Sequence, residues 1–128
     1  MDLQLADKTC LVTGAGAGIG LATAVALARE GAQVVVVAAR TVGALAPALG
    51  LIKNAGGRTP ITATGDLGRP GGAAALASQV LSAVGHVDIL VNNAGASWPD
   101  PDGEQAWEAG LALSSWPRGN CPNSCFPA

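Results

Sequence analysis

Apolar positions along the chain follow two alternating patterns. Short, nearly unbroken apolar runs predict strands that are buried in a sheet, and they occupy residues 8–13, 34–38, 61–64 and 87–91. Longer stretches rich in Ala and Leu predict helices, and they occupy residues 18–30, 42–54, 71–84 and, as the start of a further helix, 103–113. In the first of these helices the residues that recur on one face are Ile19, Ala22, Ala26 and Leu27. Pro47 marks an early break or the first turn of the second helix, and Gly56 and Gly57 end it.

Strands and helices therefore alternate along the chain. This order implies right-handed crossovers and a parallel sheet with helices on both faces. We expect an α/β fold, a Rossmann-type doubly wound parallel sheet that is incomplete, with about four strands. We expect residues 1–113 to form this unit, and residues 114–128 to form an irregular tail that has neither the strand pattern nor the helix pattern. The tail has two explanations: a native loop, or loss of the native reading frame near Ser114.

Composition narrows the classes of partner. Hydrophobic residues make up 49% of the chain and charged residues 12%, which excludes a disordered protein. The net charge is −2 without a basic block, so we expect no nucleic-acid partner. The start does not resemble a signal peptide and no apolar run could span a bilayer, so we expect a cytoplasmic protein without a membrane partner. Cys10 fits a core position, whereas Cys121 and Cys125 alone do not make a metal site.

A glycine-rich bend follows the first strand and opens the first helix. Its glycines are Gly14, Gly16, Gly18 and Gly20, with the spacing G-x-x-x-G-x-G for the first, third and fourth. Residues without Cβ allow a tight turn and close approach of a phosphate, and the following helix N-terminus offers N–H groups to a pyrophosphate. No Lys-Ser/Thr pair follows, which excludes a nucleoside-triphosphate P-loop. The bend therefore predicts a dinucleotide site, with a purely structural turn as the alternative.

The end of the second strand bears on which dinucleotide binds. An acid for a ribose 2′-hydroxyl is expected there in NAD-binding units, and an Arg nearby for a 2′-phosphate in NADP-binding ones. This chain has Ala38, Ala39 and Arg40. A guanidinium binds phosphate through paired hydrogen bonds. The sequence favours NADP(H), and it leaves open NAD(H) and a solvated surface role for Arg40.

These motifs together resemble the short-chain dehydrogenase/reductase family. The resemblance rests on Thr13-Gly14-x-x-x-Gly18-Ile19-Gly20, on Asp66-Leu67 after the third strand and on Asn92-Asn93-Ala94-Gly95 after the fourth. It covers roughly residues 5 to 113, the front part of a typical member. Members transfer a hydride between NAD(P)(H) and a carbonyl or alcohol substrate.

The resemblance assigns roles residue by residue. Gly14, Gly18 and Gly20 would shape the pyrophosphate loop, and Ile19 would lie beside the nicotinamide half. Asp66 would bind the adenine with Leu67 beside it, Asn92 would contact the adenosine ribose side, Ala94 and Gly95 would line the nicotinamide cleft, and Arg40 would meet the 2′-phosphate. Asp66 as a turn residue, and Asn92 and Asn93 as partners of backbone groups at a strand end, are the alternatives. Ala17 departs from the basic residue that many NADP-preferring members carry before the second motif glycine.

The catalytic residues of the family have no counterpart in the chain. Members use a Ser, a Tyr and a Lys four residues after the Tyr, and this sequence contains no Tyr. The comparison with the family therefore favours a truncated gene product whose last residues are out of frame. We expect such a product to carry no catalytic residue and not to form the oligomers of the family. Three functions remain open: the binding portion of an oxidoreductase that is inactive alone, a nucleotide-binding module without turnover, and a fragment that does not function.

Overall fold

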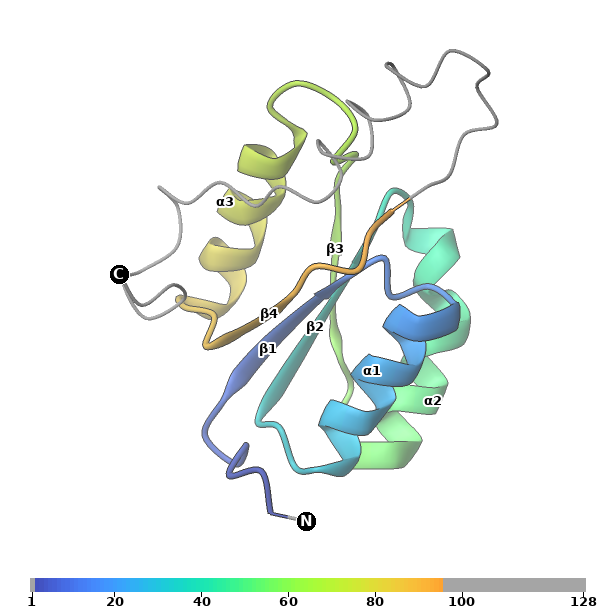
Figure 1. The fold of residues 1–128 in the computed structure, drawn as a ribbon, viewed down its shortest axis with the longest axis vertical. Coiled ribbons are helices and arrows are strands. Elements are labelled where there is room, and N and C mark those ends of the chain that lie inside the picture. The colour runs from blue at the N-terminus through green and yellow to red at the C-terminus, as the bar shows by residue number, and fades with distance from the viewer. Residues whose placement is uncertain (1, 96–128) are drawn as a thin grey trace.

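A parallel sheet forms the centre of the molecule, and the computed structural model describes residues 2–95 of the chain. The elements, in chain order, are β1 (Thr9–Thr13), α1 (Gly18–Arg29), β2 (Val34–Ala39), the 3-10 helix η1 (Val42–Leu45), α2 (Ala46–Gly56), β3 (Ile61–Thr64), α3 (Gly72–Val84) and β4 (Ile89–Val91). The strands lie in the order β3-β2-β1-β4, and every pair is parallel. Helices α1 and α2 cover one face and α3 covers the other (Figure 1).

This arrangement confirms the Rossmann-type fold predicted from the sequence. The predicted helix at 42–54 divides into η1 and α2, with Pro47 in the first turn of α2, where its missing N–H removes no helical bond. The predicted strand at 87–91 begins only at Ile89. The predicted helix from residue 103 and the tail at 114–128 lie outside the described residues.

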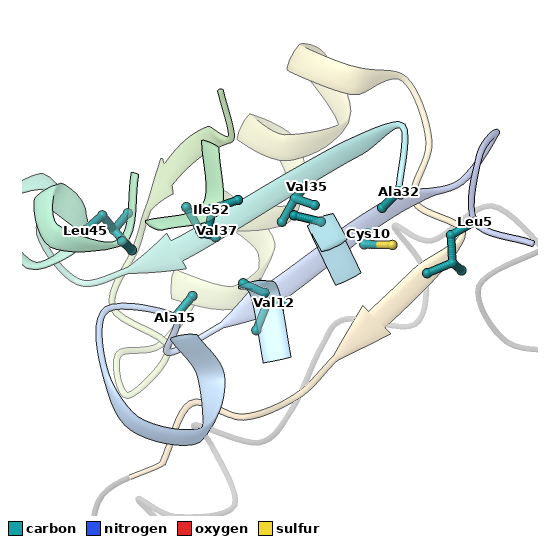
Figure 2. Packing of buried hydrophobic residues seen from close by; sticks show 12 residues of the cluster. Leu5, Cys10, Val12, Ala15, Ala32, Val35, Val37, Leu45 and Ile52 are labelled. Carbon is teal, nitrogen blue, oxygen red and sulfur yellow. The ribbon is translucent and has the colours of Figure 1, made fainter. Parts of the chain in front are cut away.

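Strand β2 shows why its run of valines carries no alternation. Val35 and Val37 pack on the side of α1 and α2, and Val36 and Ala38 pack on the side of α3. Both faces of the strand are buried, as in other parallel sheets that helices cover on both sides. Figure 2 shows the first of these clusters, which contains Val12, Val35 and Val37 of the sheet together with Leu45 and Ile52.

The buried face of α1 differs from the sequence-based expectation. Ile19 is 79% exposed, and Ala22 and Ala26 are exposed as well, so that only Leu27 of the predicted face packs against the core, where it is partly buried. The helix instead buries Gly20, Ala24 and Ala28. Small side chains on this face let the helix axis lie close to the sheet and to α2, and a Cβ at Gly56 of α2 would lie 2.7 Å from the carbonyl oxygen of Ala28. Because the helix carries apolar residues on every side, its period alone did not identify the face that packs.

Candidate dinucleotide site

A cleft of about 720 Å³ lies at the carboxyl ends of the four strands. Its lining takes residues at or just after the end of each strand: Thr13 and Gly14 at β1, Ala39 and Arg40 at β2, Gly65 to Gly68 after β3, and Ala94 and Gly95 after β4. The chain runs from β1 through β2 to β3 on one side and then returns to place β4 on the other side of β1. Ligands of open α/β sheets bind at such a reversal of strand order.

The bend between β1 and α1 forms one wall of the cleft. Gly14 and Gly18 have φ angles of 65° and 58°, which side chains with a Cβ rarely adopt. Helix α1 begins at Gly18, its N-cap residue Ala17 makes no side-chain capping bond, and its first turn contains no acid. The N–H groups and the positive dipole end of α1 are therefore available to an anion.

Side chains at the end of β4 fix the position of this bend. Asn93 donates from Nδ2 to the carbonyl oxygens of Thr13 and Gly14, at 3.2 and 3.1 Å. Thr13 Oγ1 accepts the N–H groups of Asn93 and Ala94, at 3.1 and 3.0 Å, and lies 3.4 Å from the carbonyl oxygen of Val91. A Cβ at Gly20 would collide with Asn93 Nδ2 and with the carbonyl oxygen of Gly14. The bend is thus shaped by contacts that leave no room for a side chain at position 20.

Arg40 supplies positive charge to the lining of the cleft. It is exposed, lines the cleft and forms no ion pair with any residue from 2 to 95. Ala38 and Ala39 precede it, so no carboxylate stands at the end of β2. A phosphate bound beside Arg40 would therefore meet no repulsion from a carboxylate at the end of β2.

Comparison with known proteins agrees with this geometry. The family model described as short chain dehydrogenase matches residues 8–114. This chain belongs to the short-chain dehydrogenase family. Glucose 1-dehydrogenase of Gluconobacter oxydans is 42% identical over 98 residues, which make up 77% of this chain and 36% of that protein.

Solved structures of the short-chain dehydrogenase family share the fold. L-sorbose reductase from Gluconobacter frateurii, solved with NADPH and L-sorbose, has a TM-score of 0.73 and 35% identity over 88% of this chain and 47% of that one. The NADH-dependent reductase A1-R′, solved with NAD, has a TM-score of 0.71 and 30% identity over 86% of this chain and 47% of that one. This chain therefore spans less than half the length of these dehydrogenase-family proteins.

The residues that the sequence predicts to bind the cofactor fall into two groups. Those that line the cleft are Gly14, Gly16, Arg40, Asp66, Leu67, Ala94 and Gly95. Gly18, Ile19, Gly20 and Asn92 lie outside the lining, and the side chains of Ile19 and Asn92 are exposed.

Asp66 combines a place in the cleft with a local structural role. Its Oδ1 accepts the N–H of Gly68 at 3.0 Å, and its Oδ2 lies 3.3 Å from Arg69 Nε in an exposed ion pair. The turn-residue alternative is thus present in the structure. The carboxylate still lines the cleft, so a ligand there would meet an oxygen that the turn has already oriented.

The sequence-based site gave Thr13 no role, and it gave Asn93 only the alternative role of a partner for backbone groups at a strand end, which the structure confirms. Thr13 is 1% exposed, although it is polar and ends an apolar strand, and that position is the signal that could have identified it. Within residues 2–95, no cluster of potential metal ligands occurs and no helix is long and apolar enough to cross a membrane.

Proposed function

We propose that the cleft binds NADP(H). The pyrophosphate would lie against the bend from Gly14 to Gly20 and the N-terminus of α1, the adenine beside Asp66 and Leu67, the adenosine ribose side near Asn92, and the nicotinamide half between Ile19 and the Ala94-Gly95 segment. Arg40 would bind the 2′-phosphate. Family membership and relatives solved with NADPH or NAD support a nicotinamide dinucleotide.

The observation that favours NADP(H) is the exposed guanidinium of Arg40 in the cleft wall, next to Ala39. Units that prefer NAD(H) place an acid at the end of β2, where it accepts a hydrogen bond from the 2′-hydroxyl and repels a 2′-phosphate. An alanine at position 39 removes this repulsion, and an arginine at position 40 adds paired donors for the phosphate oxygens.

Membership of the short-chain dehydrogenase family supports a second proposal, which concerns activity rather than binding. We propose that the site serves hydride transfer between NADP(H) and a carbonyl or alcohol substrate, and that the 128 residues alone bind cofactor without turnover. Reduction of a carbonyl needs a proton donor beside the nicotinamide, and the sequence contains no tyrosine to act as one.

Fluorescence titration with NADPH and NADH tests the binding proposal. The expected result is tighter binding of NADPH, with Arg40→Ala weakening it by about tenfold or more through loss of charged hydrogen bonds. Ala39→Asp is expected to reverse the preference. Arg29→Ala is the matched control, because Arg29 is also an exposed arginine but lies in the last turn of α1, away from the cleft. Equal binding of both cofactors, or equal losses in Arg40→Ala and Arg29→Ala, would contradict the proposal.

An assay of NADPH oxidation with aldehydes and ketones tests the second part. The expected result is cofactor binding without NADPH consumption above the buffer rate. Sustained consumption would contradict a silent module, and failure to bind either cofactor would favour a chain without function.

A further inference from the structure

Gly16 is needed for a different structural reason than the neighbouring glycines of the bend. Gly14 and Gly18 have positive φ angles, whereas Gly16 has not, so its backbone suits any L-residue. A Cβ at position 16 would nevertheless lie 2.6 Å from the carbonyl oxygen of Ala44 and 3.3 Å from its carbonyl carbon. Because both atoms belong to the backbone, no side-chain rotation can make room. The bend therefore packs directly on η1 at this point.

The bend is held more firmly than the segment that it touches. The N–H of Ala15 donates to the carbonyl oxygen of Ala38 at 3.2 Å, and Ala15 is fully buried. The carbonyl oxygen of Gly14 accepts from Asn93. A methyl group at position 16 would therefore displace the η1 side rather than the bend.

The η1 side is a short exposed segment between two fixed ends. Ala39 pairs with Thr64 in the sheet, and Leu45 is fully buried in the core (Figure 2). All residues from 40 to 44 are exposed, and the first of them is Arg40. Displacement of Ala44 would therefore move the exposed segment from 40 to 44, and this segment carries the guanidinium of Arg40.

We propose that Gly16 is a positioning residue that determines cofactor selectivity. Its missing Cβ lets the 40–44 segment pack on the bend, and this packing holds Arg40 where a 2′-phosphate binds. The inference rests on the proposed NADP(H) function. NADPH and NADH share the pyrophosphate, but only NADPH carries the group that Arg40 would bind. Displacing the segment therefore lowers the affinity for NADPH relative to NADH.

The test is the ratio of the NADH and NADPH dissociation constants in Gly16→Ala. We expect this ratio to fall about tenfold, the size of one charge-assisted contact. Gly43→Ala is the matched control, since Gly43 lies in η1, has no positive φ and would place its Cβ in open space; its ratio stays at the wild-type value. In an Arg40→Ala background, Gly16→Ala is expected to leave the ratio unchanged, because the residue that it positions is absent.

Equal losses for both cofactors in Gly16→Ala would overturn the inference, since they indicate damage to the shared pyrophosphate site alone. If Gly16→Ala does not fold, amide NMR of the wild-type chain decides: the Gly16 resonance is expected to differ between the NADPH and NADH complexes, and coincident resonances would overturn the inference. A wild-type chain without preference for NADPH contradicts the proposed function itself. A preference that Arg40→Ala abolishes and Gly16→Ala leaves intact contradicts only the role of Gly16.

Discussion

At the scale of single residues, the side chain of Asn93 joins the end of β4 to the glycine bend. Asn93 is partly buried and donates to two backbone oxygens. The preceding residue, Asn92, is exposed. Asn93→Ala leaves both acceptors without this donor, so we expect the free energy of unfolding to fall by about 1–3 kcal/mol. Asn92→Ala is the control, with a change within about 0.5 kcal/mol. Urea denaturation measures both values, and equal values would contradict the role given to Asn93.

The Cys10 thiol gives the stability of the fold an alkaline pH dependence. Burial raises the pKa of Cys10 from 9.0 to about 11, and the Asp88 carboxylate adds to the rise. Between these values the unfolded chain has lost the thiol proton while the folded chain retains it. The free energy of unfolding therefore falls as the pH rises from about 9 to 11, by roughly 1.4 kcal/mol for each pH unit.

Denaturation of wild type and Cys10→Ala across this pH range measures that contribution. The variant should lack this part of the slope, and every other ionisable group is common to the two proteins, so its contribution cancels in the comparison. Parallel stability curves would contradict a buried, protonated thiol.

At the scale of elements, the sequence predicted which segments of residues 2–95 are strands and which are helices. The valine run of β2 is buried on both faces, and the glycine after each helix limits where that helix can extend, so local chemistry was sufficient there. The sequence did not predict how α1 faces the sheet, or that the backbone groups bound by Asn93 belong to the glycine bend. Both depend on contacts between residues far apart in the chain, such as Asn93 with Gly14.

The orientation of α1 can be tested with one substitution at two positions. Ala24 is fully buried, whereas Ala26 is exposed. Ala24→Leu forces a larger side chain between α1 and the core, so we expect a loss of about 1–3 kcal/mol in the free energy of unfolding. Ala26→Leu adds the same atoms in solvent and should change it by less than about 0.5 kcal/mol. Chemical denaturation of the two variants decides, and the reverse order would indicate that the face of Ile19, Ala22 and Ala26 is the buried one.

At the scale of the whole molecule, the cleft connects every strand of the described sheet. Its lining follows the carboxyl ends of β1, β2, β3 and β4, so a ligand that fills it contacts segments from residue 13 to residue 95. Strand β4 pairs with β1 and with no other described strand, and its residues are only half-buried. A ligand that binds only the folded chain should therefore stabilise the sheet as a unit, β4 included.

This coupling predicts a cofactor-dependent stability. At 100 times its dissociation constant, NADPH should raise the free energy of unfolding by about 2.7 kcal/mol, with a higher melting temperature and slower hydrogen exchange at Leu90 and Val91. In Arg40→Ala the same NADPH concentration should give a smaller shift, whereas the shift with NADH should equal that of wild type. Calorimetry and exchange mass spectrometry measure both effects. Slower exchange confined to the bend, with β4 unaffected, would contradict the coupling, because the ligand would then be held by the β1–α1 segment without a contribution from β4.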